Sequence, residues 1–134
     1  MNSLTSGCAG LVFIELYTLD IPASTRLFTE VFGFVITQDE PGLKCLRSTR
    51  AIVLLNDGHD LRAGHRFHGK ITGRNHGDCV EIGIIVENLK EASRRAKALG
   101  CYQVTDIVLQ DWGMRDFRIV TNEGFYLRVT EPYD

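Results

Sequence analysis

An internal repeat of secondary-structure signals constrains the fold of this 134-residue chain more than any other feature. Each half begins with an apolar run, 11–19 or 79–86, rich in the residue types typical of strands. Each run leads into a helical pattern that ends at a glycine, Gly33 or Gly100, which suits the left-handed conformation of a helix C-cap. Further extended segments follow both helices. The chain is therefore predicted to contain two half-modules of βαβββ order.

Turn residues and the periodicity between them set the limits of these elements. After its helix, the first half is expected to contain strands at 34–36, 43–47 and 51–55. The second half is expected to contain a helix at 89–99 and strands at 102–109, 115–120 and 124–130. The half-modules span about 10–56 and 78–132, and a long loop, 57–77, joins them.

These elements predict an α+β fold in one domain, 1–134. Because neither half-sheet can cover both of its faces alone, the two are expected to form a curved, cup-shaped sheet of eight strands. Alternate residues from both halves would line the cup, which is the expected ligand site. A chain of this length can bury a sufficient core without disulfides or metals.

Composition excludes several function classes. The formal net charge is only -2 and no block of like charge occurs, so neither nucleic acid nor an anionic membrane surface is an expected partner. No apolar stretch approaches the ~20 residues of a membrane span. The opening residues 1–6 lack the features of a secretory signal, which predicts a cytoplasmic protein.

Four cysteines lie far apart, and no Cys-x-x-Cys pair occurs among Cys8, Cys45, Cys79 and Cys101. Three of them fall in or at the start of runs expected to become strands. They are expected to be buried reduced thiols rather than metal ligands.

Several segments, in order and over nearly the whole chain, resemble the vicinal oxygen chelate superfamily, which includes glyoxalase, bleomycin-resistance and dioxygenase proteins. They are 15–20 (ELYTLD), 27–28 (LF), 32–34 (FGF), 111–117 (DWGMRDF) and 122–129 (NEGFYLRV). The resemblance implies a glyoxalase/bleomycin-resistance-like fold. It does not imply one activity, because the superfamily contains metal-dependent enzymes as well as metal-free proteins that sequester drugs.

The resemblance also implies where a metal would bind. Its ligands would be His and Glu side chains at four strand positions, which correspond here to Phe13, Leu54, Glu81 and Arg128. Phenylalanine and leucine have no lone pair and arginine stays protonated, so only Glu81 could bind a metal. No metal and no cofactor are therefore expected, and the pattern is closest to the metal-free, bleomycin-resistance-like members.

The residues expected to bind the ligand lie on the strands and one turn. They are Phe13, Glu15, Tyr17, Leu54, Glu81, Trp112 and Arg128.

Each polar or aromatic candidate has an alternative structural role. Glu15 could be a general base or a counter-charge for a cationic ligand, or it could pair with Arg128 or lie exposed at a strand edge. Glu81 and Arg128 could form an ion pair that orients a ligand, or one that is purely structural. Trp112 could stack on a flat ligand at the rim of the cup or fill a dimer interface.

The loop 57–77 contains all four histidines in an irregular, glycine-rich segment. His65 and His68 have no carboxylate at useful spacing, so the loop is expected to cover or gate the site rather than to hold a metal.

The leading hypothesis is metal-independent binding or sequestration of a small, aromatic molecule by a homodimer. The alternative is a lyase, isomerase or dioxygenase-type enzyme of the same superfamily, with or without a divalent metal, in which Glu15 or Glu81 acts as general base. A third possibility is a regulatory domain that binds a protein partner.

Overall fold

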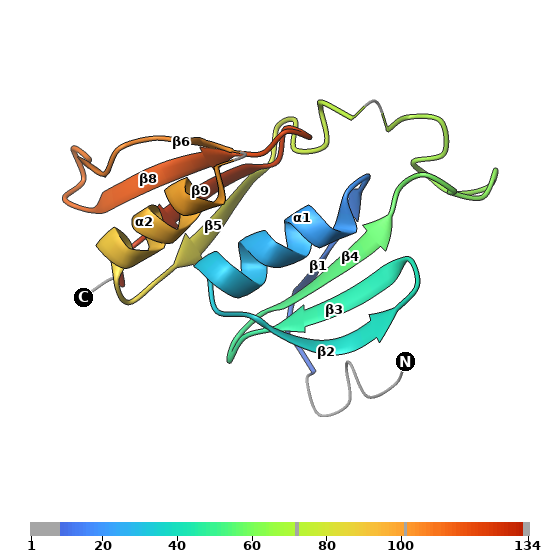
Figure 1. Cartoon of the computed structure of the whole chain (residues 1–134), viewed down its shortest axis with the longest axis horizontal. Coiled ribbons are helices and arrows are strands. Elements are labelled where there is room, and N and C mark those ends of the chain that lie inside the picture. Colours follow the sequence, from blue (N-terminus) through green and yellow to red (C-terminus); the bar gives the residue numbers. More distant parts are fainter. Residues whose placement is uncertain (1–8, 72, 101, 133–134) are drawn as a thin grey trace.

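The structure is a computed structural model that describes residues 9–71, 73–100 and 102–132. It contains two sheets that lie side by side, each with a helix on the same side (Figure 1). This arrangement confirms the α+β fold of two half-modules. The loop between the halves runs along one end of the molecule and has no helix or strand over residues 58–71 and 73–80.

The first half forms a four-stranded sheet in the order β1-β4-β3-β2. Its strands are β1 (Phe13–Thr18), β2 (Val35–Glu40), β3 (Leu43–Arg47) and β4 (Ile52–Asp57). β1 is parallel to β4, and the other pairs are antiparallel. The helix begins as α1 (Ile21–Arg26) and continues as a π-helical turn, η2 (Leu27–Val31).

The second half repeats this topology in the order β5-β9-β8-β6. Its elements are β5 (Glu81–Ile85), α2 (Leu89–Leu99), β6 (Gln103–Val104), β7 (Val108–Leu109), β8 (Arg115–Val120) and β9 (Tyr126–Thr130). The single strand expected at 102–109 is instead two short strands that both pair with β8. Between them, the Thr105 hydroxyl accepts a hydrogen bond from Arg118 N at 2.7 Å, so a side chain replaces part of the ladder.

Both helices begin and end as the sequence predicts. Asp20 and Asn88 cap α1 and α2 by accepting hydrogen bonds from backbone N–H groups of the first turn. Gly100 ends α2 in the left-handed conformation, at φ 72°. The corresponding Gly33 follows η2 at φ 74°.

One hydrophobic cluster lies between the sheets and the helices and takes residues from both halves. The first half contributes Leu27, Phe28, Val31, Phe34, Leu46, Val53 and Leu55. The second contributes Leu89, Ala92, Ala96, Phe117, Ile119, Phe125, Leu127 and Val129. The two halves are therefore joined by a shared core.

Two of the four cysteines can be compared with the prediction, because Cys8 and Cys101 lie outside the described residues. Cys45 is buried, as expected, and is a free thiol. Cys79 is also free, but the prediction that it is buried in a strand is wrong. It is exposed in a turn with φ 63°, a conformation incompatible with a strand, and β5 begins only at Glu81.

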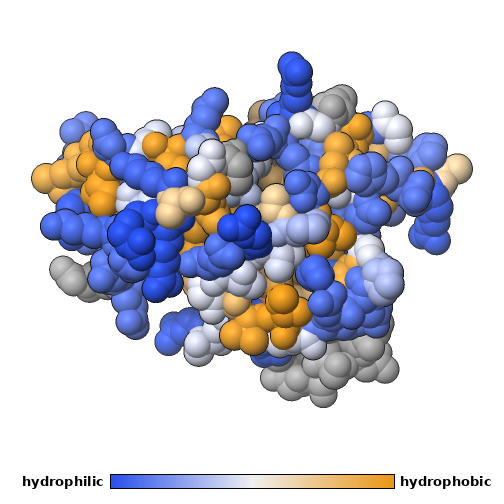
Figure 2. All heavy atoms as spheres, in the orientation of Figure 1, coloured by the Kyte–Doolittle hydropathy of each residue, from blue (hydrophilic) through white to orange (hydrophobic). Residues whose placement is uncertain are grey.

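Exposed apolar side chains occur on strand edges and at one end of the second sheet. β1 and β5 are both end strands of their sheets, and Phe13, Ile14 and Ile85 are exposed on them. Val108, Leu109 and Trp112 are exposed around the β7–β8 turn. Figure 2 shows hydrophobic residues gathered at the left end of the view, over the second sheet. None of the helices in the described part of the chain has the length and apolar character needed to cross a membrane.

Candidate functional site

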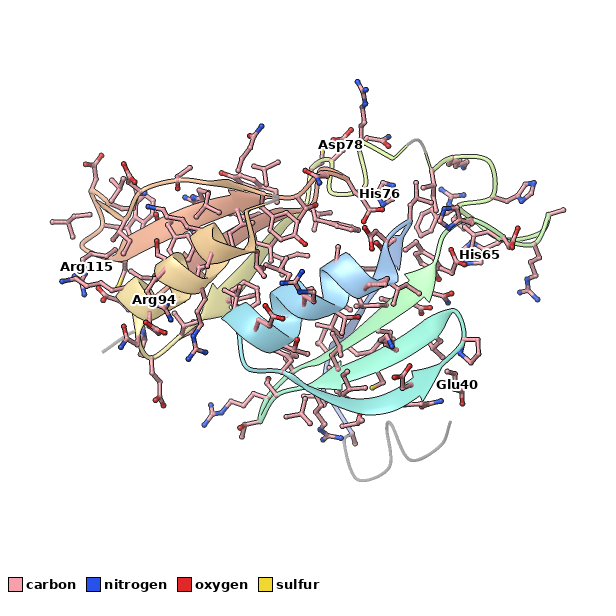
Figure 3. All side chains as sticks on the ribbon, in the orientation of Figure 1. Glu40, His65, His76, Asp78, Arg94 and Arg115 are labelled. Carbon is pink, nitrogen blue, oxygen red and sulfur yellow. The ribbon has the colours of Figure 1, made fainter. Side chains whose placement is uncertain are left out.

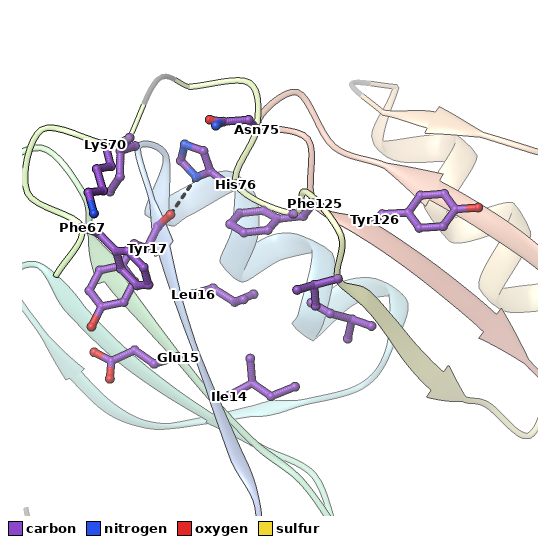
Figure 4. A pocket seen from close by; sticks show the side chains of 14 residues that line it. Ile14, Glu15, Leu16, Tyr17, Phe67, Lys70, Asn75, His76, Phe125 and Tyr126 are labelled. Atoms are coloured by element: carbon purple, nitrogen blue, oxygen red, sulfur yellow. Dashed lines mark hydrogen bonds between the residues drawn. The ribbon is translucent and has the colours of Figure 1, made fainter.

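A pocket of about 430 Å³ lies between the facing edges of β1 and β5, beneath the connecting loop (Figure 4). This volume falls within the range of about 300–1,000 Å³ that is usual for small-molecule sites. Because each sheet ends at this gap, residues of β1 with both side-chain orientations reach the pocket. β1 contributes Ile14, Glu15, Leu16 and Tyr17.

The remaining lining comes from the loop and from the second half. The loop contributes Phe67, Lys70, Ile71, Asn75, His76, Gly77 and Val80, and the second sheet contributes Ile82, Phe125 and Tyr126. Most of these side chains are apolar or aromatic. Because loop residues form much of this lining, the loop covers the pocket, as expected for 57–77.

Tyr17 holds one end of the loop through aromatic contacts. Its ring meets the rings of His65 and Phe67 edge-on, with centroids 4.9 and 5.3 Å away. The Tyr17 hydroxyl lies 3.1 Å from His65 Nε2, within hydrogen-bond distance. Burial, followed by the nearby charge of Glu15, raises the pKa of Tyr17 above 10.0, so the phenol is neutral at physiological pH.

His76 holds the other end of the loop. Only 3% of its side chain is exposed. Its Nδ1 donates a hydrogen bond to the backbone oxygen of Tyr17 at 2.8 Å, and its ring packs edge-on against Phe125. Because a carbonyl oxygen can only accept, this bond assigns the Nδ1 proton to the histidine.

Close backbone approach fixes the same region. A Cβ at Gly77 would lie 2.6 Å from the backbone oxygen of Gly124, and a Cβ at Gly124 would lie 2.1 Å from that of Arg74. Gly124 also has φ +87°, which a side chain would disfavour. The loop therefore packs directly on the turn that precedes β9.

Glu123, in that turn, connects the second half to the first. Its carboxylate accepts hydrogen bonds from the Thr18 hydroxyl and from Leu19 N at the end of β1. It lies 3.6 Å from His76 Nδ1. One carboxylate therefore joins β1, the loop and the second sheet.

Glu15 is half-buried on the edge of the pocket, and Figure 4 shows its carboxylate beside Tyr17. It accepts a hydrogen bond from Asn56 Nδ2 at 2.9 Å. The alternative in which Glu15 pairs with Arg128 is therefore wrong. The side chain that binds its carboxylate is Asn56, on the neighbouring strand β4 of the same sheet.

The second sheet has a charged face on the side away from α2. Register and alternation place Glu81, Arg118, Tyr126 and Arg128 on this face. Glu81 forms an ion pair with Arg118, so the predicted Glu81–Arg128 pair is wrong. The reason is geometric: Arg118 reaches Glu81 across β9, whereas Arg128 is opposite Gly83 rather than Glu81.

The residues at the four metal-ligand positions do not fit a divalent metal. Phe13 and Leu54 offer no donor atom, Arg128 is a cation, and Glu81 is engaged by Arg118. Over residues 9–71, 73–100 and 102–132, no group of three or more His, Cys, Asp or Glu side chains is arranged to hold a metal ion.

The structure divides the seven predicted ligand residues among four places. Glu15 and Tyr17 line the pocket. Phe13 and Leu54 share their sheet face with Glu15, while Glu81 and Arg128 lie on the charged face of the second sheet. Trp112 is 58% exposed in the β7–β8 turn, outside the pocket lining.

Sequence analysis missed the loop and the second-half aromatics of the pocket. Phe67 and His76 gave no periodic signal, because a long loop is positioned only by the surfaces it meets. A signal did exist for Phe125 and Tyr126, which follow Gly124 within one of the segments that carry the family resemblance.

Comparisons with known proteins identify relatives by structure only. No protein-family model matches the chain, and no curated protein matches its sequence. The bleomycin resistance determinant encoded on transposon Tn5 has a TM-score of 0.61 at 19% identity, over 94% of this chain and 100% of that chain. Fosfomycin resistance protein FosX from Mesorhizobium loti has a TM-score of 0.68 at 12% identity, over 93% of each chain.

An enzyme is also among the structural neighbours. Lactoylglutathione lyase from Agrobacterium tumefaciens has a TM-score of 0.62 at 20% identity, over 92% of this chain and 93% of that chain. These similarities cover both half-modules. The chain therefore has the fold of the vicinal oxygen chelate superfamily, which includes glyoxalase, bleomycin-resistance and dioxygenase proteins.

Proposed function

We propose that the protein binds and sequesters a small aromatic molecule, without a metal, in the pocket between β1 and β5. The observation that carries this proposal is the lining of that pocket, which combines Tyr17, Phe67 and Phe125 with few polar groups. Aromatic walls favour flat ligands through offset and edge-on contacts. The similarity to resistance proteins that include a bleomycin resistance determinant supports the same conclusion.

Two charged side chains would orient the ligand. Glu15 and Lys70 both line the pocket, on β1 and on the loop. In an otherwise apolar site, a small number of polar groups fixes the direction of a ligand rather than supplying most of its affinity.

We further propose that the protein acts as a homodimer. Among the described residues, β1 and β5 each have one edge without a strand partner, and apolar side chains are exposed on both. Unpaired edges of this kind readily associate with another chain. A second copy that covers them would bring Phe13 and Leu54 of one chain near the charged face of the other.

A metal-free enzyme that uses Glu15 as general base is the second candidate, since its carboxylate lies at the pocket beside the neutral phenol of Tyr17. A measurement of turnover distinguishes the enzyme from the sequestering protein. Conversion of a bound compound that is lost in Glu15→Gln would establish the enzyme. Binding without conversion supports sequestration.

The proposal is tested by titrating a panel of flat aromatic compounds against the protein by calorimetry. Phe67→Ala should weaken a bound compound about tenfold, because it removes one aromatic wall from a half-exposed position with little effect on folding. Leu109→Ala removes an exposed apolar side chain at the other end of the second sheet and should change nothing. Equal affinity for all three proteins would overturn the proposal.

Trp112→Ala tests the predicted stacking role of that residue in the same titration. A loss of affinity similar to that of Phe67→Ala would place Trp112 in the site, as a second copy of the chain could arrange. Unchanged affinity would confine the site to the pocket of one chain.

A further inference from the structure

Arg128 is a half-buried cation whose guanidinium has no hydrogen-bond or ion-pair partner among the described residues. Its Nε is buried and makes no hydrogen bond. Burying a charged group without a partner is costly, because the lost hydration is not replaced. Folding alone therefore leaves the buried Nε–H donor of Arg128 unused.

The neighbours of Arg128 increase this cost. In the antiparallel pair of β8 and β9, Arg118 lies directly opposite Arg128, and like charges in that relation repel. Two carboxylates are nearby, but both engage Arg118: Glu81 forms an ion pair with it, and Asp116 lies 3.6 Å from it. Asp116 also accepts a hydrogen bond from Gln110. The charge of Arg118 is balanced, and that of Arg128 is not.

The other neighbour of Arg128 leaves room for a ligand. In the parallel pair of β5 and β9, its partner is Gly83, which presents no side chain. A Cβ built at Gly83 would meet no heavy atom within 4 Å. Arg128 therefore stands beside an open place on the sheet, at the position where the resemblance would put an acidic metal ligand.

We propose that this place binds an oxyanion, a carboxylate or phosphate group of a small molecule, through the guanidinium of Arg128. Arg118 is engaged by Glu81 and Asp116, so it does not compete for the same anion. Guanidinium groups bind such oxyanions strongly because the donors match the acceptor geometry. The site goes beyond the proposed aromatic pocket, whose lining does not include Arg128.

The test uses inorganic phosphate and succinate as probes, with the whole protein at constant ionic strength in sodium chloride. Both the thermal midpoint and calorimetric binding are measured over low millimolar concentrations, where general salting-out is small. Saturable binding of either probe is expected. A response to one probe alone would identify which oxyanion chemistry the site selects.

Arg128→Gln should weaken the bound probe about tenfold to hundredfold, the loss expected for a charged hydrogen bond. The same variant should melt no lower than the parent without probe, because it removes an unpaired cation. Arg128→Lys keeps the positive charge but lacks the paired N–H donors of the guanidinium, so this variant should bind the probe with intermediate affinity. Arg115→Gln is the matched control, because Arg115 lies at the far end of β8 and pairs with Glu131 (Figure 3).

Three results would overturn the proposal. They are no saturable response to either probe, an unchanged affinity in Arg128→Gln, or a melting point of Arg128→Gln that falls with protein dilution more steeply than that of the parent. The last would mean that a carboxylate of a second copy is the partner of Arg128. None of these results depends on whether the pocket binds an aromatic compound, which the Phe67→Ala titration tests separately.

Discussion

The two sheets have the same topology but opposite chemistry on the faces that point away from the helices. On the first sheet, Cys45, Ile52 and Leu54 form a small buried apolar cluster on this face. On the second sheet, the corresponding face contains Glu81, Arg118 and Arg128. On the sides that face α1 and α2, by contrast, both sheets present large apolar residues to one shared core.

This contrast shows which side of a repeated unit is free to change. The helix-facing side must fill the same space in both halves, so only apolar residues of suitable size are compatible with it. The opposite side has no helix to meet, so its residues can differ between halves without loss of the fold. Two halves with one plan can therefore supply an apolar surface and an ionic surface to a single molecule.

The largest expected effect comes from the side that the halves share. Phe117→Ala, in the second sheet, and Leu55→Ala, in the first, each empty a fully buried position and should lower the free energy of unfolding by about 3–5 and 2–5 kcal/mol. Denaturant titration measures both. Val35→Ala, at an exposed position of β2, should change the free energy of unfolding by less than about 0.5 kcal/mol.

The second prediction compares the two outer faces. Leu54→Asn places an amide in the apolar cluster at a position only 7% exposed, and it should lower the free energy of unfolding by about 3 kcal/mol. Glu81→Gln removes the partner of Arg118, but these side chains are 38% and 20% exposed, so the loss should stay below about 1 kcal/mol. Similar losses in the two variants would show that the faces do not differ as described.

The third prediction concerns the connection between the halves. Glu123→Gln replaces a carboxylate that accepts two hydrogen bonds from the end of β1, and it should lower the free energy of unfolding by about 1–3 kcal/mol. Hydrogen exchange should also quicken at Leu19. Asn122→Ala changes the exposed neighbouring residue and serves as the control. An equal loss of unfolding free energy in that variant would contradict the role assigned to Glu123.

The smallest effect distinguishes α2 from α1 and is lost in acid. Hydrogen bonds from Arg94 and then from Arg95 lower the pKa of Glu91 to about 2 from 4.5. Because the folded pKa is depressed, this stabilisation is present above about pH 4.5 and is lost as the pH falls through about 2. Glu91→Gln should therefore melt below the parent near neutrality, with the difference closing as the solution becomes acidic.

The cluster is fully exposed, so the shift in melting temperature should be small and should shrink with added salt. The double variant Arg94→Gln, Arg95→Gln should reproduce the acid dependence of Glu91→Gln. A parent and a Glu91→Gln profile that stay parallel down to pH 2 would contradict this assignment.

Sequence reasoning located most of the elements but not their irregularities. The repeat, the caps at Asp20 and Asn88 and the amphipathic stripe of α2 are local signals, and the structure agrees with them. The break between β6 and β7 depends on a hydrogen bond between Thr105 and Arg118, which are distant in sequence. The exposed turn at Cys79 likewise depends on how the loop meets the second sheet rather than on the apolar character of the residue.

Some features of the candidate site were also predictable from the sequence, and others were not. The structure places Glu81 and Arg128 on one face of the second sheet. Alternation predicted that Glu15 shares its side of the strand with Phe13 and Tyr17. It could not predict that Glu81 pairs with Arg118 or that Asn56 binds Glu15, because partner choice depends on which strands are neighbours and on their register.

What the sequence by itself determined is the pair of βαβββ halves and their helix-facing core, since these depend on residue type and local spacing. Only the tertiary structure decided that the pocket opens between the edges of β1 and β5, that Phe67 and His76 cover it, and that Arg128 has no partner within residues 9–71, 73–100 and 102–132. The physical reason is that a side chain meets its partners through strand order and loop packing, which involve contacts across the whole chain.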